Sequence, residues 1–148
     1  MSSTQSFEKI QQLKEKELED AQVRYNRSID HFETVATDLY DLLKNKESAV
    51  THFNEQISKR SKGFEIHSAN QYLQTFQTKE QELQMKVHQA RVNMQQKQDA
   101  LNEALQEVKK LETIIDHKKY LADQLEKKNE NKFLDEISVQ QYFREMNR

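Results

Sequence analysis

The chain has 148 residues, of which 34% are apolar and 32% are charged, and its formal net charge is −2. Ordinary globular domains carry roughly 45–50% apolar residues, so this composition excludes a large compact core but suffices for a narrow seam between two helices. Basic and acidic residues are mixed along the chain, which argues against nucleic-acid binding and against a basic helix lying on a membrane. With one glycine, no proline and no cysteine, the backbone can stay helical over most of its length.

A seven-residue apolar repeat runs through the first half of the chain. One of its two positions is occupied by Leu18, Tyr25, Phe32, Leu39, Lys46 and Phe53, and the other by Ala21, Ser28, Val35, Leu42, Ala49 and Gln56. Such a repeat is typical of a helix that packs against another helix in a coiled coil. We therefore expect a first helix over about 5–61.

The single glycine, Gly63, predicts the place where the chain reverses. Basic residues between positions 59 and 62 would stabilise the end of the first helix, and Gly63 can take a left-handed conformation there. Ser68 with Gln71 matches a capping box that would open the next helix. We expect a turn over about 62–67.

The repeat resumes in the second half and predicts a second helix over about 68–131. Its a positions are Leu73, Glu80, Val87, Met94, Leu101, Val108, Ile115, Ala122 and Asn129, and its d positions are Phe76, Leu83, Ala90, Lys97, Ala104, Leu111, Lys118, Leu125 and Lys132. Antiparallel pairing with the first helix would set Leu39 opposite Ala90 and bring Lys46 within one turn of Glu80. These polar seam residues are expected to reach water or to pair locally. The predicted fold is all-α, a long antiparallel two-helix coiled-coil hairpin forming a single domain.

The C-terminal part of the chain should overhang this hairpin, because in this register the first helix has no residues left to pair with the second helix beyond about Leu125. Ser138 with Gln141 matches another capping box and predicts a short helix over about 138–147. Apolar residues are frequent in this segment. They are expected either to fold back on the hairpin or to dock into another protein.

The sequence contains no glycine-rich phosphate loop, no nucleophile motif and no cysteine. Its histidines never occur at metal-binding spacing, and a two-helix fold offers no enclosed pocket in which a carboxylate pKa could be tuned. We therefore expect a non-enzyme without cofactor or metal. No run approaches the ~18 apolar residues of a membrane span, and the first residues do not match a signal peptide, which makes a cytoplasmic protein the default expectation.

Three stretches of the chain together resemble the FliJ family of the flagellar type III export apparatus. They are Phe7-x-x-Ile-x-x-Leu13 followed by Lys-Glu-Lys-Glu, the central Asn70-Gln71-Tyr72-Leu73-Gln74-Thr75-Phe76, and Leu134-Asp135-Glu136-Ile137. The resemblance covers nearly the whole chain and rests on the order and spacing of these motifs.

The resemblance implies a stalk at the centre of the flagellar export ATPase hexamer, linked to the export gate protein FlhA and assisting export chaperones. By the same resemblance, the gate-binding positions are Leu42, Tyr72 and Phe76, although Leu42 and Phe76 also fit a purely structural role in the seam. This chain departs from the family's often apolar surface at Asn45, Ala49 and Lys79. By analogy with the rotary gamma subunit, the open end of the hairpin would enter the ring. The residues expected to bind the ring are Phe133, Ile137, Tyr142 and Phe143.

Two other functions remain open at this stage. The chain could be an export chaperone or escort that binds client proteins through its termini, or a self-associating coiled-coil scaffold. The hairpin interpretation expects a monomer in isolation, with no direct membrane insertion and a place at the cytoplasmic side of the cell membrane when assembled.

Overall fold

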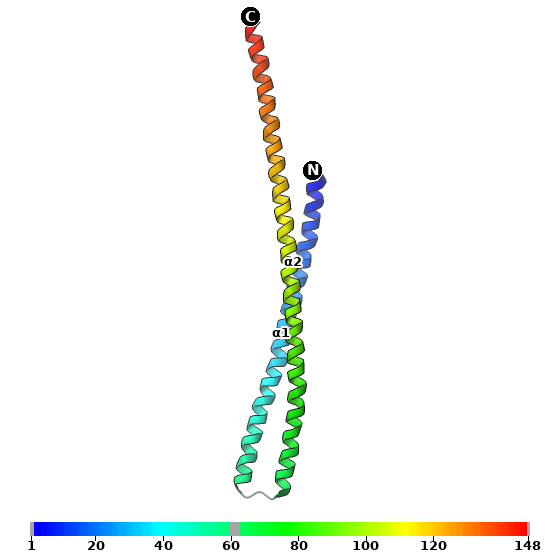
Figure 1. The fold of residues 1–148 in the computed structure, drawn as a ribbon, viewed down its shortest axis with the longest axis vertical. Coiled ribbons are helices and arrows are strands. Elements are labelled where there is room, and N and C mark those ends of the chain that lie inside the picture. The colour runs from blue at the N-terminus through cyan, green and yellow to red at the C-terminus, as the bar shows by residue number, and fades with distance from the viewer. Residues whose placement is uncertain (1, 60–62, 148) are drawn as a thin grey trace. The chain divides into compact units, whose positions relative to one another are not determined.

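The computed structural model describes residues 2–59 and 63–147, with side chains placed over 5–59 and 66–147. Helix α1 spans Ser2–Ser58 and helix α2 spans Gly63–Met146, and no strand occurs among the described residues (Figure 1). The predicted all-α fold of two long helices packed against each other is confirmed.

The two helices contribute to two compact units, each built from both helices. One unit consists of residues 19–102, and the other combines residues 1–18 with residues 103–148. We call them the hairpin unit and the terminal unit.

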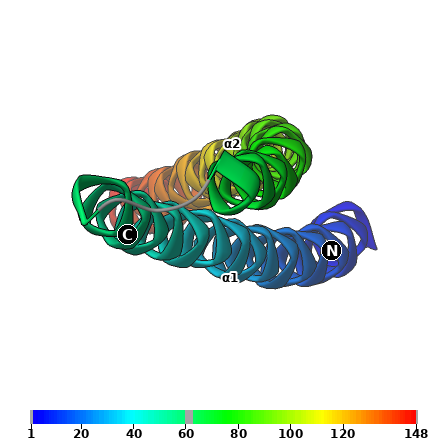
Figure 2. The same cartoon turned by 90° about the horizontal axis from the view of Figure 1, so that it is seen from below.

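In the hairpin unit, the second half of α1 lies beside the first half of α2, as two perpendicular views show (Figures 1 and 2). Val35, Val87 and Ala90 form a buried cluster, against which Phe32 and Leu39 pack. All of these residues belong to the predicted repeat, and Leu39 shares the cluster with Ala90 as the antiparallel register requires. Even so, no described side chain of the chain is less than 2% exposed, so the core is a thin seam.

Polar residues of this seam find local partners. The buried hydroxyl of Ser28 donates a hydrogen bond to the carbonyl oxygen of Tyr25 over 2.6 Å, which satisfies it without a residue from α2. Lys46 Nζ lies 2.9 Å from Glu80 Oε2, and this ion pair joins α1 to α2. The expectation of local pairing is therefore confirmed for Lys46 and Glu80.

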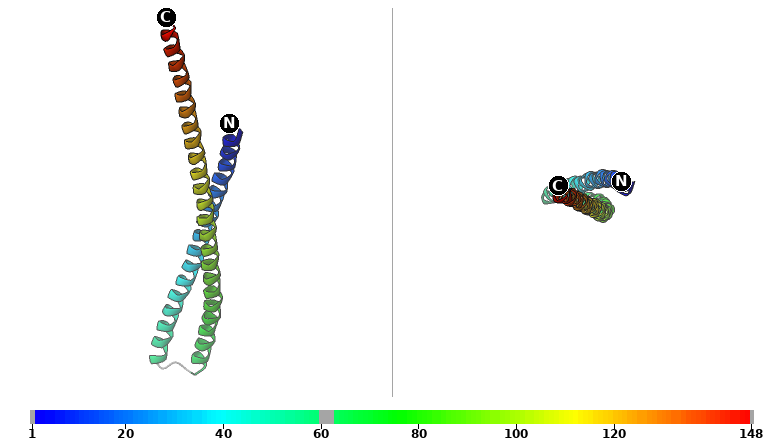
Figure 3. Two further views of the ribbon diagram at one scale, coloured as in Figure 1. Left: turned by 45° about the horizontal axis from the view of Figure 1, so that its top comes forward. Right: turned by 90° about the horizontal axis from the view of Figure 1, so that it is seen from above.

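In the terminal unit, Val108 and Ile115 of α2 are buried, and the start of α1 packs near them. The ring of Phe7 lies under Lys118, whose Nζ is 4.4 Å from the ring centroid, and Glu8 Oε1 is 3.8 Å from Lys119 Nζ. In the left-hand view of Figure 3, the blue start of α1 runs alongside α2, and the two helices move apart toward the N-terminus. From residue 119 to residue 147, every described side chain is exposed except the half-buried Ile137.

The helix boundaries differ from the sequence-based expectations near the middle of the chain. Helix α1 ends at Ser58, and the Lys59 N–H is shared between the carbonyl oxygens of Glu55 and Gln56. Gly63 opens α2 instead of ending α1, so Ser68 lies inside a helix and cannot cap it. The expected turn at 62–67 is therefore wrong over 63–67. Residues 60–62, which include the basic Arg60 and Lys62, lie outside the described part.

The short separate helix over 138–147 is likewise wrong, because α2 continues without a break from Gly63 to Met146. Ser138 and Gln141 are exposed on this helix, where a serine costs at most about 0.5–0.7 kcal/mol relative to alanine. A capping motif starts a helix only where the preceding residues leave the helical conformation, and the residues before Ser138 are helical.

Candidate interaction surfaces

Four rings in the hairpin unit form an aromatic cluster that connects the seam to the surface. His52 and Phe53 have ring centroids 5.8 Å apart, Phe53 and Tyr72 are also 5.8 Å apart, and Tyr72 and Phe76 are 5.1 Å apart. The last two pairs meet edge to face, a favoured geometry worth about 0.5–1.5 kcal/mol per pair beyond area burial.

Burial changes across this aromatic cluster. Phe76 is buried and Phe53 half-buried, whereas Tyr72 is 52% exposed and His52 is also exposed. The inner rings hold Tyr72 in place, so that a preordered aromatic surface faces the solvent. Such a surface suits protein binding, because little side-chain entropy remains to be lost.

The structure does not bring all three expected gate-binding residues together. Tyr72 and Phe76 are in ring contact, but Leu42 is half-buried elsewhere in the seam. It precedes Phe53 by eleven positions on α1, which corresponds to about 16 Å along the helix. The partners that α1 provides instead are His52 and Phe53. The register that sets Leu39 opposite Ala90 also sets Phe53 opposite Phe76, so the repeat contains a signal for Phe53 but none for His52.

The second surface is the C-terminal end of α2, which carries the four expected ring-binding residues. Phe133, Tyr142 and Phe143 are 62%, 62% and 58% exposed, and Ile137 is half-buried. The rings of Tyr142 and Phe143 lie 6.2 Å apart. α2 is unbroken through these residues, and the side chains of Phe133, Tyr142 and Phe143 are exposed to solvent.

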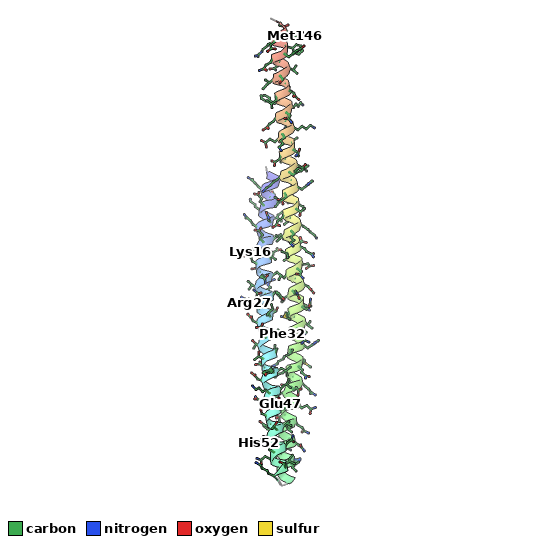
Figure 4. All side chains as sticks on the ribbon, turned by 90° about the vertical axis from the view of Figure 1, so that its left-hand side faces the viewer. Lys16, Arg27, Phe32, Glu47, His52 and Met146 are labelled. Carbon is green, nitrogen blue, oxygen red and sulfur yellow. The ribbon has the colours of Figure 1, made fainter. Side chains whose placement is uncertain are left out.

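These four residues do not share one face of α2. Phe133 and Ile137 are four positions apart and lie on the same side of an α-helix, whereas Tyr142 follows Phe133 by two and a half turns and points the opposite way. Side chains project from α2 on both sides of the stretch that ends at Met146 (Figure 4). The end of the helix therefore presents apolar groups around its circumference.

Among the described residues, no three histidine or acidic side chains come close enough to hold a metal ion. The depression lined by Lys46, Asn70 and Glu80 is open to solvent and cannot exclude water from a reaction. In the same described part, neither helix contains a stretch apolar and long enough to pass through a membrane.

Comparison with known proteins identifies the family. The family model described as the flagellar FliJ protein matches residues 3–147. The chain belongs to the FliJ family. A FliJ relative, the flagellar FliJ protein of Bacillus subtilis (strain 168), is 29% identical over 136 residues, which are 92% of this chain and 92% of the relative. No solved structure matches the chain.

The family match confirms the resemblance found in the sequence, and it spans both surfaces of this FliJ-family chain. The aromatic cluster and the C-terminal end of α2 both lie within the matched residues. Membership thus places the two surfaces in a flagellar protein.

Proposed function

We propose that this FliJ-family chain is a non-catalytic component of the flagellar protein export apparatus. In this role it is the central stalk of the export ATPase ring, links the ring to the export gate protein FlhA, and assists in handling export chaperones and substrates. It acts in the cytoplasm, at the cytoplasmic side of the cell membrane once assembled.

The observation that carries the stalk role is the exposed end of α2. Phe133 and Tyr142 are exposed to similar extents on opposite sides of one unbroken helix. A partner that bound a single face would leave one of them in water, whereas a ring of subunits around the helix can cover both. Exposed aromatic side chains are also the residue type that most often anchors protein interfaces.

The mixed charge of the chain supports the same role. Lysine and arginine total 23 and aspartate and glutamate total 25, so neither sign dominates the surface. Exposed ion pairs contribute about 0–1 kcal/mol each, and many such contacts with surrounding subunits would hold a stalk without trapping it in one orientation.

For the link to the export gate, we propose the aromatic cluster, with Tyr72 as its exposed anchor. Phe76 supports Tyr72 from the seam, and Leu42 contributes to the packing of the hairpin unit and not to the contact itself. The two surfaces would then have separate partners, the ring for the end of α2 and FlhA for the aromatic cluster.

The test measures binding of purified variants to the export ATPase and, separately, to the cytoplasmic part of FlhA. Removing residues after Lys128, which deletes the proposed ring anchors, should weaken ATPase binding at least about tenfold and leave FlhA binding intact. Tyr72→Ala should do the reverse. Tyr40→Ala is the matched control, because Tyr40 is 64% exposed in the same unit without belonging to the aromatic cluster.

The same exposed end supports a second candidate, an export chaperone or escort that binds client proteins through its termini. A truncated chain that binds the ATPase as well as the full chain does, but no longer retains flagellar export substrates, would favour this candidate. It would also remove the C-terminal end of α2 from the ring contact.

A further inference from the structure

The apolar repeat of α2 continues beyond Lys118 and Lys119, which contact Phe7 and Glu8 at the start of α1. The positions that continue this repeat after Val108 and Ile115 lie further along the same unbroken helix. They are Ala122, Leu125, Asn129, Lys132, Glu136, Val139, Phe143 and Met146, and we call them the tail face.

Among the side chains that the structure describes, none buries the apolar residues of the tail face. Leu125 is 60% exposed, Val139 52%, Phe143 58% and Met146 64%, although equivalent positions of the repeat are buried at Val108 and Ile115. The first turns of α1 contact α2 at Lys118 and Lys119. They leave Leu125, further along α2, exposed. The tail face thus continues the repeat of an existing helix–helix interface, but its apolar side chains are exposed.

We propose that a second copy of this chain covers the tail face, with the two α2 ends side by side and antiparallel. The chain would then self-associate, in contrast to the monomer that its sequence leads us to expect. In the symmetric arrangement centred between Lys132 and Glu136, each Lys132 lies opposite the Glu136 of the other copy. Leu125 then meets Phe143, Ala122 meets Met146, and Asn129 meets Val139. Ala122 opposite Met146 also combines a small with a large residue, which favours close packing of the two helices.

The charges at the centre select this arrangement. A parallel pairing would set Lys132 against Lys132 and Glu136 against Glu136, so that like charges repel in both layers. An antiparallel pairing shifted by one repeat would place Leu125 opposite Glu136 or move it past the end of the helix. Only the symmetric arrangement joins opposite charges while keeping apolar residues together.

The hairpin unit contains a precedent for such a polar layer. Its own seam joins Lys46 to Glu80 over 2.9 Å, with side chains 36% and 20% exposed. A lysine and a glutamate that face each other across two helices are therefore compatible with the packing of this chain. The tail face would form the same kind of lysine–glutamate contact between two copies.

This inference does not rest on the proposed function, although the two are connected through Phe143. That side chain belongs to the tail face and is also a proposed ring anchor, whereas Phe133 lies off the tail face. Self-association would therefore compete with ring binding.

The decisive experiment is sedimentation of the full chain over a wide concentration range, with two charge-reversal variants. Lys132→Glu alone leaves acidic residues at both central positions, and Glu136→Lys alone leaves basic ones. Each variant should self-associate at least about tenfold more weakly than the parent, because two attractive pairs become repulsive. An equimolar mixture of the two variants should associate, since every glutamate then meets a lysine.

Two controls complete the design. The double variant K132E/E136K restores opposite charges within one chain and should recover the parent's self-association. Lys127→Glu changes the same charge on the side of α2 away from the tail face, and it should have no effect. Circular dichroism of each variant verifies that helicity is retained.

A parent chain that stays monomeric at every concentration would overturn the proposal and assign the tail face to another protein. Failure of the mixed variants to associate would equally overturn it. Neither outcome depends on the ATPase or on FlhA, so the proposed export function would stand or fall separately.

Discussion

The hairpin unit and the last 27 residues of α2, from residue 120 to Met146, carry the same kind of repeat but differ in what covers it. In the hairpin unit, α1 shields Val87 and Ala90 to 9% and 3% exposure, whereas Val139 at an equivalent position is 52% exposed. Helical conformation is common to both regions. The difference teaches that local helix formation and tertiary burial are separable in this chain: the first comes from the residues themselves and the second from a partner.

Matched substitutions at two valines test this comparison, and one of them should have the largest effect on the free energy of unfolding. Val87→Asp places a charge in the buried cluster and should lower the free energy of unfolding by about 3–5 kcal/mol, enough to unfold a thin seam. Val139→Asp should change it by less than about 0.5 kcal/mol, because that side chain already faces water. Urea unfolding followed by circular dichroism at low protein concentration measures both, and equal losses would refute the distinction.

Replacing the ion pair between Lys46 and Glu80 tests how much this pair contributes to the stability of the hairpin unit. With Lys46 and Glu80 both changed to leucine, we expect a gain of about 1–2 kcal/mol, since apolar packing replaces two partly desolvated charges. Lys46→Leu alone should gain less, because Glu80 keeps only its hydrogen bond from Gln84. A double variant less stable than the parent would show that the ion pair stabilises the seam more than apolar contact can.

The contact between Phe7 and Lys118 marks where pairing stops in the terminal unit. Phe7→Ala should cost about 0.5–1 kcal/mol through loss of the cation–π contact. Leu13→Ala is the control, because Leu13 is 57% exposed. If both substitutions cost the same in thermal unfolding, Phe7 is no more a part of the helix–helix contact than an exposed leucine is.

Removal of the residues after Lys128 should have the smallest effect on stability. The deleted segment buries almost nothing, so the thermal midpoint of the remaining chain should move by no more than about 2 °C at low concentration. Total helical signal should fall in proportion to the residues removed. A large drop in the midpoint would mean that the end of α2 is covered in solution.

Much of this architecture was predictable because the seven-residue repeat indicates which face of each helix is buried against the other helix. Positions such as Ala21, Val35, Phe76 and Val108 were assigned to the seam, and all four are buried. The antiparallel register also followed, since only that alignment joins Leu39 to Ala90 and Lys46 to Glu80.

Two local capping motifs do not mark helix starts in this chain. Ser68 and Ser138 begin residue patterns that can cap a helix, but neither lies at a helix start. A serine on a solvated helix face costs little, so the same residues fit the inside of a helix equally well. The sequence pattern alone could not separate these two cases.

The sequence by itself determined the helical class, the seam residues and the mixed surface charge, because these follow from composition and from spacing along one chain. Tertiary structure alone decided which side chains act together. It joined His52 and Phe53 to Tyr72 and Phe76, kept Leu42 apart from them, and left the end of α2 without cover. Contacts between helices depend on distances in space, which residue spacing constrains only within a single helix.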